Sequence, residues 1–235
     1  MLHSVRKLTK LWSSLMPSET IRPARARSAE EKNQRRDDIL RAAERLWTTT
    51  TYAELSMNQV AREAKLAKGT LYLYFDTKEE LFLALLSEHL GQWIARTSDL
   101  LIERQPRTPQ QVTDVLLDSA DSLTPLRRLL VLLGTVLERN VRPELGLEFR
   151  RELDAQLRRL VQHMPYSPPV TLRLLRHLYA LAIGWQQFKE SLPGLDAQTG
   201  QPREELPGEY RAEFELALRG VVEQLAAQDA RANAV

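Results

Sequence analysis

Signals for the start of an α-helix recur along this chain. Four segments place a hydroxyl residue at a predicted N-cap and a Glu or Gln three residues later, which forms a capping box: Ser28–Glu31, Ser56–Gln59, Thr77–Glu80 and Thr108–Gln111. Thr124 and Ser167 each precede a proline, which is favoured at the first helical position. Between these points, apolar residues recur every three to four positions, as on one face of a helix. The sequence therefore predicts an all-α protein.

The same boundaries predict nine helices. They are expected at about residues 29–48, 57–63, 68–74, 78–104, 109–121, 125–139, 143–163, 168–191 and 209–229. Residues 192–208 are rich in proline and glycine and are expected to form a long exposed loop. The predicted organisation is a flexible basic extension (1–27), an N-terminal helical domain (28–77) and a C-terminal helical bundle (78–235). Residues 2–16 are interpreted as a tail, or as lying upstream of a true start at Met16, in preference to an accessory arm on DNA.

Charge is distributed unevenly along the 235 residues. Residues 1–76 contain 14 Lys and Arg against 9 Asp and Glu, whereas residues 77–235 contain 19 against 22. A basic end on a nearly neutral remainder is typical of a nucleic-acid-binding protein. The chain has no cysteine, which excludes disulfides and thiolate sites and fits a reducing cytoplasm. Its longest apolar runs are too short to span a bilayer, so no membrane partner is expected.

Residues 57–74 have the dimensions of a helix–turn–helix, with the turn at Ala64–Leu66. The preceding helix carries an apolar stripe that can pack behind both short helices: Ile39, Leu40, Ala43, Leu46 and Trp47. Leu71 and Phe75 lie four residues apart and are expected to face this core. A helix of one to two turns has too little surface to bury its tyrosines as well, which argues against the alternative that all its aromatic residues are core residues.

The residues left to project outward are of types that bind DNA. Lys68 and the backbone NH groups around Gly69 can meet a phosphate, and glycine allows the backbone to approach closely. Thr70 and Leu73 are candidates for base edges, Leu73 by contact with a thymine methyl group. Contacts to the DNA backbone are expected from Tyr72, Tyr74 and Lys78, and from Ser56 and Asn58.

Residues 33–83 resemble the TetR family of bacterial transcriptional repressors. The matching residues are Ile39-Leu-x-Ala-Ala43, Tyr52, Ser56-Met57, Val60-Ala61, Ala64, Lys68-Gly-Thr-Leu-Tyr72, Tyr74-Phe75 and Lys78-Glu-Glu-Leu81. The resemblance implies a three-helix DNA-binding domain, a C-terminal helical domain for effector binding and dimerisation, and a palindromic operator. The chain departs from the family pattern at Thr51 and Lys65, where glycine is usual, and at Ala67, where serine is usual. Lys65 in a left-handed turn would cost about 1–2 kcal/mol relative to glycine.

Residues 168–191 are apolar on nearly all sides, which indicates a helix buried against two partners. With residues 209–229 this helix is interpreted as half of a two-fold four-helix interface, similar to the family's dimer contact. The expected interface residues are Leu178, Leu181, Trp185, Phe214, Leu218 and Val221. The alternative is an ordinary core within one chain.

A small-molecule cavity is expected among the helices of the C-terminal domain. The candidate lining residues are His89, Trp93, Leu133, Phe149 and Trp185. Each of them alone is more often a core residue than a ligand contact. The four histidines have no metal-ligand spacing, and no nucleophile elbow or phosphate-binding glycine loop occurs. An enzyme, a metal site and a cofactor are therefore not expected.

The leading hypothesis is a cytoplasmic, nucleoid-associated homodimer that binds an operator in double-stranded DNA and is released by a small-molecule effector. Such a protein would most often be a repressor. The alternative keeps the helix–turn–helix but uses it on a protein partner. Replacement of Lys68 and Tyr72 discriminates between them, because only the first hypothesis predicts a loss of DNA binding.

Overall fold

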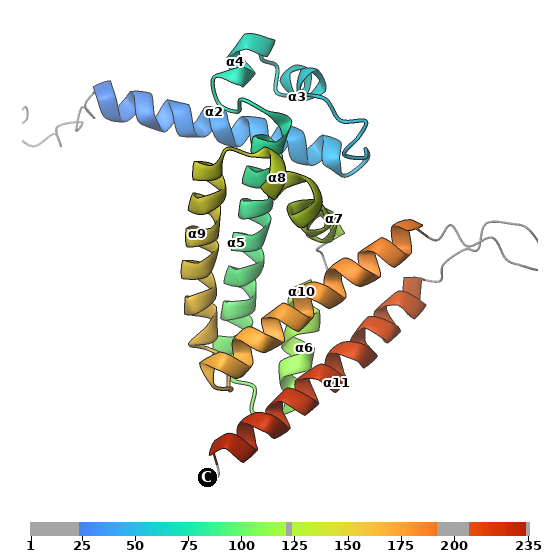
Figure 1. Cartoon of the computed structure of the whole chain (residues 1–235). Coiled ribbons are helices and arrows are strands. Elements are labelled where there is room, and N and C mark those ends of the chain that lie inside the picture. Colours follow the sequence, from blue (N-terminus) through green and yellow to red (C-terminus); the bar gives the residue numbers. More distant parts are fainter. Residues whose placement is uncertain (1–23, 121–123, 192–206, 234–235) are drawn as a thin grey trace, which may run out of the picture. The chain divides into compact units, whose positions relative to one another are not determined.

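The computed structural model describes residues 24–120, 124–191 and 207–233, and every regular element in these ranges is helical (Figure 1). The elements are α2 (Ala24–Trp47), α3 (Met57–Glu63), α4 (Lys68–Tyr72), α5 (Lys78–Arg104), α6 (Pro109–Ala120), α7 (Thr124–Leu132), the π-helix η1 (Leu133–Leu137), α8 (Glu138–Asn140), α9 (Pro143–Val161), α10 (Pro168–Ser191) and α11 (Pro207–Asn233). The prediction of an all-α protein is confirmed. The chain comprises two compact units, residues 1–38 and residues 39–235.

In the first unit, residues 24–38 form the N-terminal part of α2. Within it, Gln34 Nε2 donates to Asp38 Oδ1 at 3.3 Å. Because the helix begins at Ala24, Ser28 lies inside it, and the capping box predicted there is wrong. Ala24–Arg27 contains only alanine and arginine, which have high helix propensity, so the helix can extend beyond the local start signal. The predictions for residues 1–23 fall outside the described residues.

We call residues 39–77 the head. Ser56 caps α3 as predicted, because its side chain accepts from Gln59 N while the Gln59 side chain accepts from Ser56 N. The turn after α3 places Lys65 at φ 56°, in the left-handed region, and Ala67 precedes α4 without a side-chain cap. The left-handed conformation that carries the expected cost at Lys65 is therefore present, and α4 also lacks the cap that a serine at position 67 could provide. The head has a continuous core that includes Ile39, Leu40, Ala43, Trp47, Leu55, Val60, Leu71 and Phe75.

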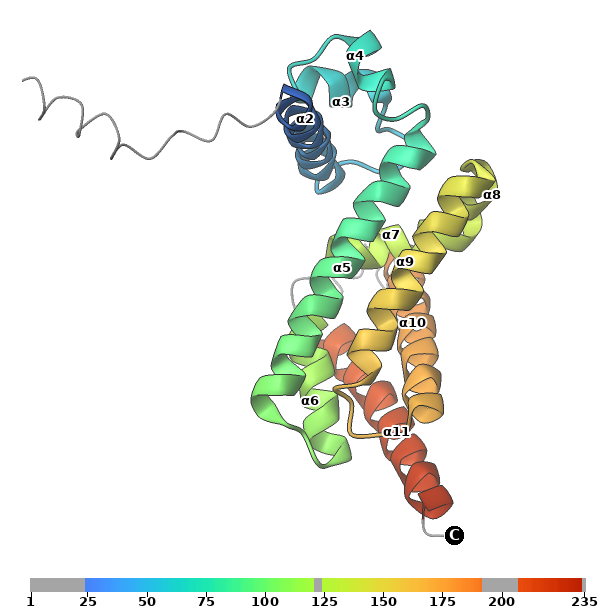
Figure 2. The ribbon, with the colours of Figure 1, turned by 90° about the vertical axis from the view of Figure 1, so that its left-hand side faces the viewer.

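We call residues 78–120, 124–191 and 207–233 the body. Its long helix α5 begins at the Thr77 cap, where Thr77 Oγ1 accepts from Glu80 N at 3.1 Å. Helix α9 packs along α5, and α10 packs against both α7 and α11 (Figures 1 and 2). One apolar cluster includes residues of α5, α7, η1 and α9 and continues into the head; a second includes residues of α6, α10 and α11. The bounds of α3, α5 and α10 agree with prediction.

The helix expected at residues 125–139 is present as a continuous helical segment, Thr124–Asn140, but η1 within it is π-helical and separates α7 from α8. The widened turn includes Gly134, which has no side chain to stabilise a regular turn, and Thr135, whose Oγ1 donates to Val131 O at 2.8 Å. A side-chain hydroxyl that bonds to the preceding turn competes with the regular backbone ladder. The π-helical turn therefore has a local cause that hydrophobic periodicity alone does not reveal.

Candidate nucleic-acid interface

Helix α4 is anchored on one side and open on the other. Leu71 is fully buried and Phe75, just beyond the helix, is 4% exposed, which confirms that these two residues face the core. Lys68 and Gly69 are exposed, and Tyr72 and Leu73 are 37% and 77% exposed. Thr70 is half-buried. One edge of α4 is thus presented to the surroundings, as the sequence predicted.

Gly69 is not required by packing within the chain. A Cβ atom built at this position meets nothing within 4 Å. The neighbouring residues therefore leave room for a side chain, and a glycine there lets the backbone come close to a molecule that approaches α4 from outside. Beside it, the Lys68 ammonium lies 5.8 Å from the centroid of the Tyr72 ring, so the cation and the aromatic ring form one outward-facing pair.

Two further DNA-binding candidates are partly engaged within the head. The Ser56 hydroxyl donates to Gln59 Oε1 at 2.7 Å as part of the α3 cap. Tyr74 is half-buried and packs against the head core. The side chain of Asn58, at the start of the same helix, is exposed. Asn58 and Ser56 are thus both exposed, although the Ser56 hydroxyl is used in the cap, whereas Tyr74 is half-buried.

Lys78 has a structural partner that sequence reasoning missed. Its Nζ donates to Tyr52 O and lies 3.9 Å from the centroid of the Tyr52 ring. The Tyr52 hydroxyl in turn donates to Glu79 Oε1 at 2.6 Å. Burial lowers the pKa of Lys78, and the charge of Glu79 partly opposes this shift. This cluster joins the loop after α2 to the first turn of α5; the only prior signal was the place of Tyr52 in the family motif.

The candidate effector residues are divided between the two apolar clusters. Leu133 and Phe149 belong to the cluster shared with the head, Trp185 packs against the α6–α10–α11 cluster, and Trp93 packs against both. Trp93 Nε1 donates to Ser119 Oγ at 3.1 Å. His89 is 8% exposed, with its Nε2 3.4 Å from Glu44 Oε1. Trp93 therefore connects the two apolar clusters among which the candidate residues are divided.

Half of the candidate dimer residues are buried within the chain. Leu178, Phe214 and Leu218 belong to the core formed with α6 and are 8%, 8% and 0% exposed, so they cannot present a surface to a second copy. Leu181, Trp185 and Val221 are half-buried at the edge of the same core. Among the described side chains of α10 and α11, the exposed large apolar residues are Leu172, Tyr179, Phe188 and Leu216. Three of the six predicted interface residues thus belong to the core within the chain, and the interface itself stays a prediction.

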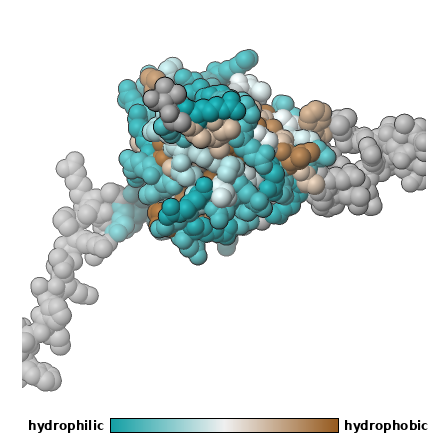
Figure 3. Space-filling model, turned by 90° about the horizontal axis from the view of Figure 1, so that it is seen from below, coloured by the Kyte–Doolittle hydropathy of each residue, from teal (hydrophilic) through white to brown (hydrophobic). Residues whose placement is uncertain are grey.

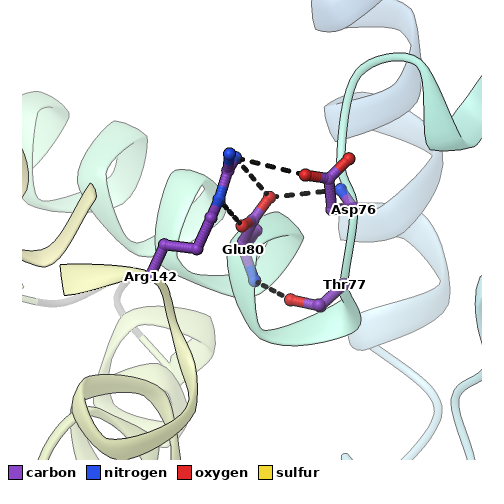
Figure 4. Close-up of polar contacts among 4 residues, drawn as sticks. All are labelled: Asp76, Thr77, Glu80 and Arg142. Atoms are coloured by element: carbon purple, nitrogen blue, oxygen red, sulfur yellow. Dashed lines mark hydrogen bonds and ion pairs between the residues drawn. The ribbon is translucent and has the colours of Figure 1, made fainter. Parts of the chain in front are cut away.

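Two arginines of the body contact the head, and sequence reasoning missed both. Arg128 on α7 donates to Trp47 O and to Thr50 O, each at 2.7 Å. Arg142, which precedes α9, donates from Nε to Glu80 Oε1 at 2.6 Å and lies 3.4 Å from Asp76 Oδ2 (Figure 4). The hydrogen bond to Glu80 raises the pKa of the Arg142 guanidinium. The only sequence signal was Glu80 itself, as a predicted capping residue.

Neither a metal site nor a membrane-spanning helix is found in the described ranges. Among these residues, no group of three or more His, Asp and Glu side chains could hold a metal ion. None of the described helices is long and apolar enough to cross a membrane. Hydrophilic residues cover most of the face shown in Figure 3, with apolar residues interspersed.

Comparison with known proteins covers both parts of the chain. A family model described as bacterial regulatory proteins, tetR family, matches residues 39–85, and one described as tetracyclin repressor-like, C-terminal domain, matches residues 87–227. A fatty acid metabolism regulator protein of Bacillus subtilis is 31% identical over 75 residues, which cover 32% of this chain and 39% of that protein. The HTH-type transcriptional regulator EthR of Mycolicibacterium smegmatis is 34% identical over 95 residues, which cover 40% and 43%. These matches span less than half of each relative.

Among solved structures, the TetR-family repressor FadR of Thermus thermophilus, in complex with lauroyl-CoA, is similar with a TM-score of 0.51 and 20% identity. The similarity covers 80% of this chain and 93% of that chain. At this level of identity, the likeness concerns the fold alone.

Proposed function

Because this chain belongs to the TetR family of bacterial transcriptional regulators, we propose that it binds a palindromic DNA operator as a homodimer and is released by a small-molecule effector. The proposal rests on one observation: α4 buries one face in the head and exposes the opposite face. Leu71 and Phe75 anchor it to the head, while Lys68, Gly69, Tyr72 and Leu73 are exposed. A second helix of this kind is what enters the major groove in a helix–turn–helix protein.

The proposed contacts divide into two kinds. Lys68, the backbone at Gly69 and the Tyr72 hydroxyl bind phosphates, together with Asn58 at the start of α3; these contacts position the head without reading sequence. Thr70 and Leu73 contact base edges, where the exposed Leu73 side chain meets a thymine methyl group. Lys78, Tyr74 and Ser56 contribute secondarily, because each is partly used within the head.

Dimerisation is proposed through the outer faces of α10 and α11. These helices carry Leu172, Tyr179, Phe188 and Leu216 on the surface, although their other faces already form the protomer core. A Cβ atom built at Gly184 or Gly220 meets nothing within 4 Å, so a second helix can approach there closely. A two-fold pairing of this face would present two copies of α4 for successive major grooves, about 34–36 Å apart.

The effector is proposed to act by population shift. A small molecule that binds more tightly to dimers with unsuitably spaced heads reduces DNA affinity, and a coupling of about 1–3 kcal/mol corresponds to about 5–150-fold. Trp93 is the best-placed of the candidate contacts, because it packs against both apolar clusters. The alternative proposal, a head that binds a protein partner, uses the same exposed edge of α4.

DNA selection from a random duplex library, followed by fluorescence anisotropy on the enriched sequence, tests the proposal. We expect the full-length chain to enrich a palindrome, and Lys68→Ala combined with Tyr72→Ala to weaken its binding at least about tenfold. Loss of one lysine–phosphate contact per protomer should also reduce the slope of log affinity against log salt by about 2. Arg159→Ala, which removes an exposed charge from α9, serves as the control. Retention of full affinity by the double variant, or enrichment of no sequence, would favour the protein-partner alternative.

A further inference from the structure

The carboxylate of Glu80 is enclosed at the junction of head and body. Its side chain is 4% exposed, and its position three residues after Thr77 is that of a capping-box partner. The carboxylate does not return to the Thr77 backbone. Instead, Glu80 Oε2 accepts from Asp76 N at 3.1 Å, one residue beyond the buried anchor Phe75 (Figure 4). Glu80 therefore holds the connection that joins α4 to α5.

The charge of Glu80 is matched by Arg142. The guanidinium donates from Nε to Glu80 Oε1 at 2.6 Å and from Nη2 to Glu80 Oε2 at 3.3 Å. The same Nη2 lies 3.4 Å from Asp76 Oδ2. A nearly buried carboxylate is costly without a partner, and a bidentate arginine restricts orientation as well as distance. Arg142 thus contacts the α4–α5 connection at Asp76 and the first turn of α5 at Glu80.

Arg142 comes from a different part of the molecule. It is the residue before α9, and its side chain caps nothing on that helix. It directly follows η1 and α8, whose residues Leu133 and Leu137 are buried in the apolar cluster that includes Phe149. A displacement in this cluster therefore has a short covalent path to Arg142. π-helical turns of this kind occur frequently at functional sites.

Arg128, which lies on α7 before η1 in the chain, makes a second contact with the head. Arg128 donates to Trp47 O and Thr50 O, carbonyl groups at and beyond the end of α2, and its guanidinium carbon lies 4.0 Å from the centroid of the Trp47 ring. Trp47 Nε1 in turn donates to Pro125 O at 3.3 Å. The segment 124–142 therefore contacts the head at two separate points: Arg128 at the end of α2 and Arg142 at Asp76, just before α5.

We propose that Arg142 is a positioning residue, which acts through Glu80 and Asp76 to set the orientation of α4 relative to the body. The inference rests on the proposed function, because its consequence concerns operator binding. In a dimer joined through the body, the orientation of each head determines the separation of the two copies of α4. The ion pair between Arg142 and Glu80 would therefore control which spacing of DNA half-sites the dimer accepts.

The test measures discrimination between spacings rather than affinity alone. The probes are the palindrome enriched by the full-length chain and duplexes in which one or two base pairs are added or removed at its centre. We expect the wild-type protein to prefer the selected spacing, and Arg142→Gln to reduce this preference by about fivefold or more. Glu80→Gln should do the same, and the double variant should add little, because both substitutions remove one interaction.

Arg150→Gln provides a matched control. Arg150 lies on α9 and pairs with Glu138 at 3.1 Å, so its replacement removes an ion pair without touching the head. Arg142→Lys retains the charge but not the bidentate geometry, and we expect an intermediate preference. It also serves as the test variant if circular dichroism shows that Arg142→Gln does not fold.

Three results would overturn the inference: an unchanged spacing preference in the folded Arg142 variant, an equal change in Arg150→Gln, or full additivity in the double variant. A wild-type protein that enriches no DNA would instead overturn the proposed function on which the inference rests.

Discussion

His89 is enclosed where α5 faces α2. It is 8% exposed, and its Nε2 lies 3.4 Å from Glu44 Oε1. Burial lowers its pKa below the ordinary value of 6.5, and the charge of Glu44 opposes only part of this shift. The folded protein therefore holds His89 neutral under conditions in which the same residue of the unfolded chain takes up a proton.

This difference predicts a pH-dependent loss of stability. Above pH 6.5 both states are neutral at His89; as the pH falls below that value, the unfolded chain binds the proton first, so the free energy of unfolding decreases until the folded pKa is reached. Urea unfolding of the wild type and of His89→Gln between pH 8 and pH 5 measures this decrease in the free energy of unfolding. We expect the decrease to be smaller in His89→Gln than in the wild type. His163→Gln, which alters an exposed histidine, should show the same decrease as the wild type. Parallel curves for wild type and His89→Gln would contradict the assignment.

At the scale of elements, the turn between α3 and α4 combines two unfavourable local features. Lys65 adopts φ 56°, and α4, five residues long, begins at Lys68, where the N-cap residue Ala67 provides no side-chain cap. The turn nevertheless holds because Leu66 N donates to Ala61 O at 2.8 Å and Leu71 is buried beneath it. Tertiary packing thus maintains a short helix that local propensity alone would not support.

Lys65→Gly should stabilise this turn. A left-handed conformation costs a non-glycine residue roughly 1–2 kcal/mol, and the greater freedom of glycine in the unfolded chain returns about half of that. The expected gain in the free energy of unfolding is therefore about 0.5–1 kcal/mol, measured by urea denaturation with an unchanged m-value. Lys65→Ala is the control, because alanine keeps the Cβ atom; an equal gain in both variants would show that backbone strain is not the cause.

At the scale of the whole molecule, the two sides of α10 and α11 have different roles. Residues such as Leu218 are buried with α6 inside the protomer, whereas Leu216, two residues earlier, is 65% exposed. An exposed apolar residue on a helix whose other face is already packed is available to a second copy.

In the proposed dimer, Leu216→Arg should therefore shift the protein toward the monomer without unfolding it. Sedimentation velocity measures the mass, and circular dichroism checks the fold. Leu147→Arg is the matched control, because Leu147 is 52% exposed on α9. Leu218→Arg should instead destabilise the protomer, since it places a charge in the core. A Leu216→Arg variant with the mass of the wild type would exclude this face as the interface.

The predicted bounds agree with the observed bounds for some helices and not for others. Helices α3 and α5 have the predicted bounds because Ser56 and Thr77 cap them through contacts only three residues away. The outward edge of α4 was predictable for the same reason, since Leu71 and Phe75 mark its inner side by spacing alone.

The amino-acid sequence by itself determined the helices, the helix–turn–helix and the residues of its exposed edge, since caps and periodicity depend on neighbours within one or two turns. Only the tertiary structure decided that Lys78 binds Tyr52, that Leu218 is buried where Leu216 is not, and that Arg142 reaches Glu80 across 62 positions. The physical reason is that burial and ion pairing depend on which distant elements pack together, and no local pattern specifies that choice.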